Sequence, residues 1–225
     1  FARVPALVIE ADATTLARLE RNVWVRKVDV DLGGTGGAVA ADESAVLNRV
    51  DLLQGVGLDG KGIKVAVVDT GVDTDHPDLA PRVVGQQCFC SHISGSGGCC
   101  PNGQATQSGA GAAEDDNGHG TNVGGIMVGA GHVAPRGALP AAQLVAIKVM
   151  DGGNGFCCTS DVVAALDWIA TQHPDTDVVN LSLGTWDLFA GACDASASYL
   201  IALKSAVDTL NTQGTVVVAS SGLII

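Results

Sequence analysis

Two short stretches of the sequence hold acid and imidazole side chains in positions that suit acid–base chemistry. Asp69 ends an apolar run at residues 65–68, which predicts a buried strand of a parallel sheet. His119 stands between two glycines, just before apolar residues that recur with helical spacing. Because open α/β sheets keep their chemistry at the carboxyl ends of their strands, we expect Asp69 to face a cleft. A carboxylate that orients an imidazole is an arrangement that activates a nucleophile.

Taken alone, Asp69 could also serve only to cap the turn that follows it. The wider pattern favours chemistry, because the blocks DTGVDTDHPDL, NGHGT and VVNLSLG follow one another along the chain. In this order they resemble the subtilisin-like serine proteases, the subtilases, over residues 42–222. The resemblance implies a serine endopeptidase in which Asp69 orients His119. The residues that it implies for binding the main chain of a peptide or protein substrate are Ser182, Leu183 and Gly184.

The sequence departs from the family at its third catalytic element. The family's serine block, a Gly-Thr-Ser-Met-Ala run, does not occur in the 225 residues. Leu223 stands where the family has the asparagine that donates to the oxyanion, and Ser220 and Ser221 lack the helix context of the family's nucleophile. An aspartate–histidine pair without a serine cannot form an acyl-enzyme. We therefore interpret the chain as truncated before the catalytic serine, and we expect no proteolysis and no fluorophosphonate labelling of it as it stands.

For a protease of this family, we expect metal ions only in a structural role. The resemblance implies no cofactor for catalysis, and a structural calcium ion is compatible with it. Asp78 matches a calcium ligand of some members, but residues 129–135 form a shorter segment than their calcium-binding loop. We therefore do not predict a calcium site at Asp78.

Two other functions compete with the protease. A non-catalytic relative could bind peptides along residues 182–184 without cutting them, by addition of a strand. A metal-dependent hydrolase is the second competitor, since carboxylates and imidazoles can hold zinc or manganese. Its candidate ligands are Asp69, His76, Asp78, Asp115, Asp116 and His119.

The elements that must position these residues alternate between strand and helix. This alternation predicts parallel strands with right-handed crossovers. With the resemblance, it implies a three-layer α/β subtilisin-like fold over residues 42–225, with a central parallel sheet and its C-terminal part missing. The predicted strands cover residues 65–68, 143–150, 177–183 and 215–220, and the predicted helices cover residues 45–53, 159–172 and 197–212.

The N-terminal residues predict a smaller unit of strand, helix and strand. The strands cover residues 5–10 and 24–30, and Asp12 is a suitable N-cap for a helix at residues 13–21. The unit, residues 1–31, resembles the last half of the subtilase propeptide, which implies an intramolecular chaperone and inhibitor whose tail lies in the active-site cleft. An additional edge of the main domain is the alternative interpretation.

A Gly- and Ala-rich stretch follows at residues 32–41, and we interpret it as a flexible linker that propeptide cleavage could cut. Gly34, Thr35 and Gly36 form a G-x-G pattern, which also occurs in dinucleotide-binding loops. Val39 occupies the third glycine position of that fingerprint, so a nucleotide cofactor is disfavoured.

Charge and composition exclude several classes of partner. The chain carries 12 basic and 24 acidic residues, a net charge of −12, without a basic stripe for nucleic acid. Its sequence holds no apolar run of about 18 residues, so no membrane association is expected. We expect a monomer whose partners are its substrate and its own propeptide.

Seven cysteines point to an oxidising compartment and to disulfides. We therefore predict a secreted or extracytoplasmic protein. Neighbouring cysteines cannot easily bond to each other, so we expect each to bridge elsewhere, and the odd count leaves one thiol over. A zinc site is the alternative for four of them. These four are Cys88, Cys90, Cys99 and Cys100, within residues 88–111, where we predict no secondary structure.

Overall fold

The computed structural model describes most of the chain: residues 2–4, 6–9, 11–23, 25–29, 31, 33–36, 48–93, 95–185 and 193–220. Several sequence predictions fall outside these residues. They concern Val39, Ser221, Leu223 and residues 45–47.

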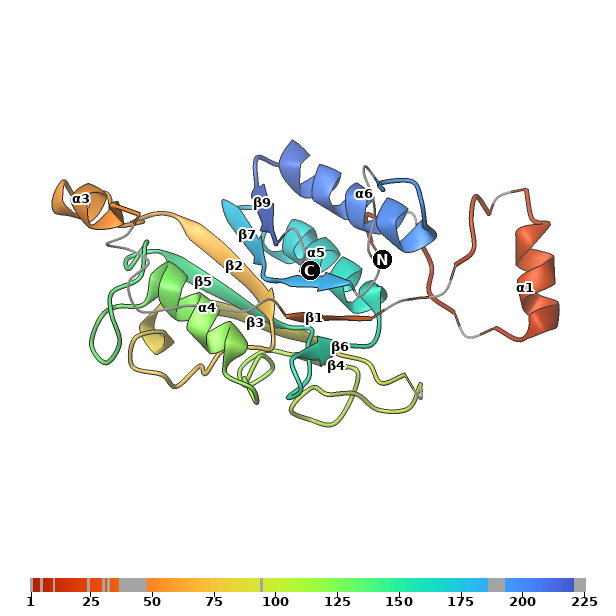
Figure 1. Cartoon of the computed structure of the whole chain (residues 1–225), viewed down its shortest axis with the longest axis horizontal. Coiled ribbons are helices and arrows are strands. Elements are labelled where there is room, and N and C mark those ends of the chain that lie inside the picture. Colours follow the sequence, from red (N-terminus) through yellow and green to blue (C-terminus); the bar gives the residue numbers. More distant parts are fainter. Residues whose placement is uncertain are drawn as a thin grey trace.

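A six-stranded sheet forms the centre of the molecule (Figure 1), and its strands run in the order β4-β3-β5-β2-β7-β9. All neighbouring pairs are parallel except the edge pair β3 and β4. The central strand β2 is apolar at residues 65–68, as the middle of a strand covered on both faces must be. The strands are β2 (Lys64–Asp69), β3 (Val83–Phe89), β4 (Thr106–Ser108), β5 (Gln143–Lys148), β7 (Val178–Leu181) and β9 (Val216–Ala219).

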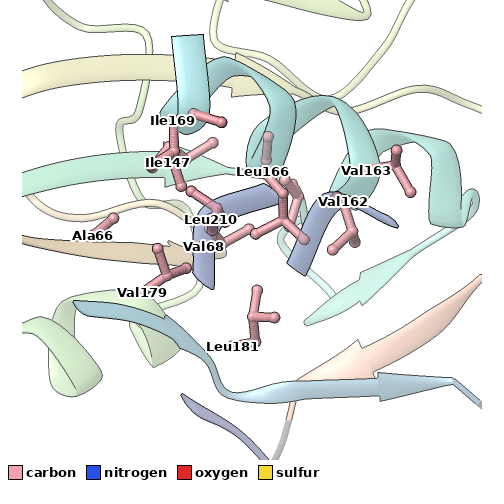
Figure 2. Packing of buried hydrophobic residues seen from close by; sticks show 14 of the residues in the cluster. Ala66, Val68, Ile147, Val162, Val163, Leu166, Ile169, Val179, Leu181 and Leu210 are labelled. Atoms are coloured by element: carbon pink, nitrogen blue, oxygen red, sulfur yellow. The ribbon is translucent and has the colours of Figure 1, made fainter. Parts of the chain in front are cut away.

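Helices cover both faces of this sheet. One face carries α4 (His119–Val128), and the other carries α5 (Thr159–Gln172) and α6 (Ser198–Thr212). Alternate residues of β2 point to opposite faces, so one strand contributes to two cores. The core on the α4 side includes Val65, Val67, Val123 and Val128, and the core on the α5 side includes Ala66, Val68, Leu166 and Leu210 (Figure 2). The three-layer α/β fold predicted from the sequence is confirmed.

The predicted helix at residues 159–172 is present with the same bounds. Two further short helices lie before β3, namely α3 (Val50–Gly55) and the 3₁₀ turn η1 (Ala80–Arg82). The helix predicted at residues 45–53 thus overlaps α3 only in part. None of the helices within the described residues has the length and apolar character needed to cross a bilayer.

A second, three-stranded sheet has the order β6-β1-β8, and β1 is antiparallel to both neighbours. Its strands are β1 (Gly34–Gly36), β6 (Gly155–Phe156) and β8 (Leu183–Thr185). The flexible linker predicted at residues 32–41 is therefore wrong for residues 34–36. These residues are extended because their backbone finds strand partners on both sides, a long-range effect that glycine content does not reveal.

The N-terminal segment contains α1 (Ala13–Glu20), whose first turn is capped by Asp12 through a bond from the Thr15 N–H of 2.7 Å. This agrees with the predicted helix. The strands predicted on either side are absent from residues 6–9 and 25–29. Leu7 is 82% exposed and Val23 is 89% exposed, so these apolar residues have no partner sheet in which to be buried.

The cysteine-rich segment is more ordered than predicted, since it contains the end of β3 and all of β4. Its four cysteines form two disulfides, Cys88–Cys100 and Cys90–Cys99, which leaves no thiolate for zinc. Cys157 and Cys158 are bonded to each other, so the expectation that neighbouring cysteines bridge elsewhere is wrong for this pair. The thiol left over is Cys193.

Candidate active site

Asp69 ends the central strand at the carboxyl edge of the sheet. The β-branched residues before it favour an extended backbone, and the turn continues through Gly71 with φ of 107°. The Asp69 side chain is completely buried, and its Oδ1 accepts the Thr70 N–H at 2.7 Å. Its Oδ2 has no hydrogen-bond partner among the described residues. The site therefore holds a desolvated carboxyl with one acceptor still free.

His119 is the first residue of α4, and its Nδ1 lies 2.7 Å from Oδ1 of Asp69. The ring is 8% exposed, so the contact is largely shielded from water. Burial raises the pKa of the Asp69 carboxyl above its ordinary value, while the hydrogen bond from His119 acts in the opposite direction. Two residues separated by 50 positions in the sequence thus form one acid–base pair.

The glycine that follows His119 is required because the first turn of α4 lies close to the end of β2. A β-carbon at this position would overlap the Gly71 carbonyl oxygen and would lie 3.0 Å from Cβ of Asp69. Only a residue without a side chain lets the first turn of α4 approach the end of β2 this closely. The Gly120 N–H uses the approach to donate to Oγ1 of Thr70 at 2.9 Å.

Asp115 holds the first turn of α4 in place. Its Oδ1 accepts the N–H groups of Asn117 and Gly118 at 2.9 and 3.0 Å, and its Oδ2 accepts the Thr121 N–H at 2.9 Å. The Thr70 hydroxyl also donates to Oδ1 at 2.8 Å. Burial alone would raise the pKa of Asp115, but these hydrogen bonds outweigh it and lower the pKa. Asp115 is therefore an ionised positioning residue for His119.

Lys148 is a second positioning residue, and sequence reasoning missed it. It lies opposite Asp69 in the β2–β5 register and is 1% exposed. Its ammonium donates to the Thr70 carbonyl oxygen at 2.7 Å and to Oδ1 of Asp116 at 2.6 Å. A lysine directly after the apolar residues 144–147 was the available signal, because a buried ammonium requires partners of this kind.

The six residues proposed as metal ligands do not converge. Asp115 caps α4 and Asp116 binds Lys148, as described above. Asp78 accepts the backbone N–H groups of His132, Val133 and Ala134. Within the described residues, three candidate ligands approach within 4.8 Å of one another only at Cys157, Cys158 and Asp161, where the two cysteines form a disulfide. This geometry does not favour a metal-dependent hydrolase.

Of the three residues predicted to bind substrate, Leu183 and Gly184 belong to β8. Ser182 lies between β7 and β8. Leu183 pairs with Gly36 and Gly184 pairs with Thr35, so residues of this chain already lie along β8. Asn180 donates to the hydroxyl of Ser182 at 2.9 Å, which gives it a structural contact.

A loop connects the acid–base pair to this second sheet. The carbonyl oxygen of Asp69 accepts the Val149 N–H at 2.8 Å, where the chain leaves β5 for residues 151–154 and β6. The side chain of Asn117, two residues before His119, donates to the Gly152 carbonyl oxygen at 3.0 Å. These hydrogen bonds therefore tie the loop before β6 to the surroundings of both members of the Asp69–His119 pair, at the end of β2 and at the start of α4.

Comparison with known proteins also indicates the subtilase family. The model of the subtilase family matches residues 60–222. The chain is 30% identical over 223 residues to the M-protease of Shouchella clausii, with 99% of the chain and 50% of the relative covered. It is 32% identical to the major intracellular serine protease of Bacillus subtilis, covering 74% of the chain and 44% of the relative. It is also 30% identical to the minor extracellular protease Epr of Bacillus subtilis, covering 99% of the chain and 32% of the relative.

The chain thus spans about half the length, or less, of these curated relatives. The family match covers well over half of the chain and includes Asp69, His119 and residues 182–184. Together with the three-layer fold, these findings establish that the chain belongs to the subtilase family of serine proteases.

Proposed function

We propose that this chain forms the acid–base and substrate-binding part of a subtilisin-type serine endopeptidase. The observation that supports the proposal most strongly is the 2.7 Å contact between Nδ1 of His119 and Oδ1 of Asp69, at the edge of a buried sheet. In this role Asp69 accepts the Nδ1–H and holds the imidazole in the tautomer whose Nε2 can take a proton. His119 would act as general base toward a serine hydroxyl and then as general acid toward the leaving amine.

The nucleophile must come from a serine that these residues do not provide. A Gly-Thr-Ser-Met-Ala run is absent from the 225 residues, and the hydroxyl of Ser220 donates to the Leu183 carbonyl oxygen at 2.8 Å. We propose that this chain alone does not cleave peptides. The position of Leu223, the residue in place of the oxyanion asparagine, lies outside the described residues.

We further propose that residues 1–31, together with the strand β1 that follows them, act as an inhibitor of the same site. The support is β1, which lies between β6 and the predicted substrate-binding strand β8 and forms backbone pairs with both. Binding of an extended segment to a sheet edge reads main chain rather than side chains. A bound N-terminal segment would therefore exclude other peptides until it is cut or released.

The disulfides and the name of the extracellular relative favour a secreted protein, which we propose as its location. We propose no calcium ion at Asp78. Three N–H groups point at its carboxylate, whereas a cation requires free oxygen lone pairs.

The complete product of the gene provides the test of the proposed function. We expect it to hydrolyse a protein substrate, to react with a fluorophosphonate and to lose both properties when His119 is replaced by alanine. A chelator should leave a catalytic step unaffected. A complete product that binds peptides without cutting them would instead support the non-catalytic alternative, and loss of hydrolysis on removal of metal would support the metal-dependent one.

A further inference from the structure

The strand β1 fits its cleft at positions that leave no room for a side chain. Gly33 and Gly34 are buried, and Gly36 is partly buried. A β-carbon on Gly34 would overlap the Gly184 carbonyl oxygen and would lie 2.6 Å from Cζ of Phe156. A β-carbon on Gly33 would overlap the Phe156 carbonyl oxygen and would lie 2.7 Å from that of Cys157. These neighbours are mainly backbone, which cannot move aside without distorting β6 or β8.

Gly36 is restricted in a different way. A β-carbon there would overlap Oδ1 of Asn154 and would lie 2.8 Å from Cγ of the same side chain. Asn154 is fixed by its backbone, which has φ of 61° and accepts the Gly36 N–H at 2.9 Å. Its Oδ1 is buried and has no hydrogen-bond partner among the described residues. The Asn154 side chain therefore leaves no room for a side chain at position 36.

Thr35 differs from its neighbours, because its side chain is exposed to solvent. The cleft thus excludes side chains at positions 33, 34 and 36, and it leaves position 35 unrestricted. The strand is anchored before it enters the cleft, since the Asp31 carboxylate accepts the N–H of Ser160 at 2.9 Å and also its hydroxyl. Ser160 lies in the first turn of α5, where the helix dipole favours an anion.

We propose that the cleft between β6 and β8 selects glycine, and that its substrates are glycine-rich segments of the pattern Gly-Gly-X-Gly. This inference rests on the proposed function, because it assigns the substrate class of the same site. Asn154 is the residue that determines specificity at the last position, whereas the backbone of residues 156, 157 and 184 determines it at the first two. The N-terminal segment inhibits because it presents this pattern from within the chain.

Single substitutions in the whole chain test the fit of the strand. Gly34→Ala and Gly36→Ala should release β1, so that backbone amides of β8 exchange with deuterium about ten-fold faster or more. Thr35→Ala is the matched control and should leave the exchange unchanged. Amides of β5 report on the main core and should stay protected in all three variants. Unchanged protection of β8 in Gly34→Ala would overturn the proposal.

Replacement of Asn154 by glycine separates the two kinds of restriction. Glycine suits the left-handed backbone at this position and removes an acceptor that has no partner, so we expect no loss of folding. Asn154→Gly should restore protection of β8 in the Gly36→Ala chain, but not in the Gly34→Ala chain, where the obstacle is backbone. Restoration of both, or of neither, would contradict the role assigned to Asn154.

Added peptides test selectivity for a ligand that is not part of the chain. Capped Gly-Gly-Thr-Gly should restore β8 protection in the Gly34→Ala chain at millimolar concentration, and capped Gly-Ala-Thr-Gly should not. Equal binding of both peptides would overturn the glycine selectivity. This readout requires no hydrolysis, so it can fail while the complete gene product is shown to be a protease. Conversely, glycine-selective binding can persist if the complete product proves to be inactive.

Discussion

The loop at residues 151–154 links the Asp69–His119 pair to the β6-β1-β8 sheet, but the molecule stabilises the two regions in different ways. The pair stands at the end of β2, between two apolar cores, and polar contacts from Asp115, Thr70 and Lys148 fix its surroundings. The second sheet consists of strands of three, two and three residues, and its central strand comes from the N-terminal segment. We therefore expect the acid–base pair to be rigid and the short strand β1 to be displaced more easily.

The largest effect should follow from a change in the core beneath the pair. Leu166 of α5 is completely buried against the sheet (Figure 2). We expect Leu166→Ala to lower the free energy of unfolding by about 2–5 kcal/mol, because it leaves a cavity. Denaturant unfolding measures this loss. The exposed residue Leu7 provides the control, since Leu7→Ala should cost far less, and equal losses would contradict the tight packing of Leu166 in the core.

Asp161, near the second sheet, should make the stability of the fold depend on pH. Burial raises the pKa of its carboxyl to about 6 and the nearby charge of Asp31 adds to this, against the opposing hydrogen bonds from Ser91. The folded state therefore holds this proton more tightly than the unfolded state does. The stabilising contribution of Asp161 should be complete below pH of about 4, and roughly 3 kcal/mol of it should be lost as pH rises past about 6.

Unfolding experiments from pH 4 to pH 7 can isolate this contribution. Asp161→Asn cannot ionise, so its free energy of unfolding should lack the decrease with rising pH that Asp161 contributes in the natural chain. Asp175→Asn, at a position whose carboxyl is largely exposed, is the control. The same pH slope in Asp161→Asn and in the natural chain would contradict the assignment.

A smaller effect distinguishes two glycines of α4. Gly120→Ala should cost about 1–3 kcal/mol, because the added methyl group must push the helix away from the end of β2. Gly125→Ala adds the same group where nothing lies within 4 Å, and alanine is the better helix former, so we expect a gain of up to about 1 kcal/mol. Thermal unfolding of the two variants compares them directly. A similar loss in both would argue against the close approach at Gly120.

The sequence predicted those elements whose side chains repeat with a clear period. The apolar strand before Asp69 and the amphipathic helix at residues 159–172 are local signals, and both were found. The strand Gly34–Gly36 has no side-chain pattern and exists through partners more than 100 residues away, so composition indicated a linker instead. The predicted N-terminal strands had the pattern, but their described residues, 6–9 and 25–29, lack a partner sheet.

The candidate site was likewise predictable only in part. Motifs singled out Asp69 and His119, and the structure brings these two side chains together. The roles of Asp115 and Lys148 depend on hydrogen bonds between segments that the sequence does not order in space. The same holds for Asn154, because its importance arises from a distance to Gly36 rather than from its residue type.

The turnover of the complete gene product, with and without the Asp69 carboxylate, tests the central claim most directly. We expect Asp69→Asn to lower kcat by roughly 10⁴-fold, because the imidazole loses the group that sets its tautomer. The control Asp175→Asn should retain the kcat of the natural enzyme. A kcat for Asp69→Asn within a few-fold of the natural value would contradict the assignment of Asp69 and His119 as the acid–base pair.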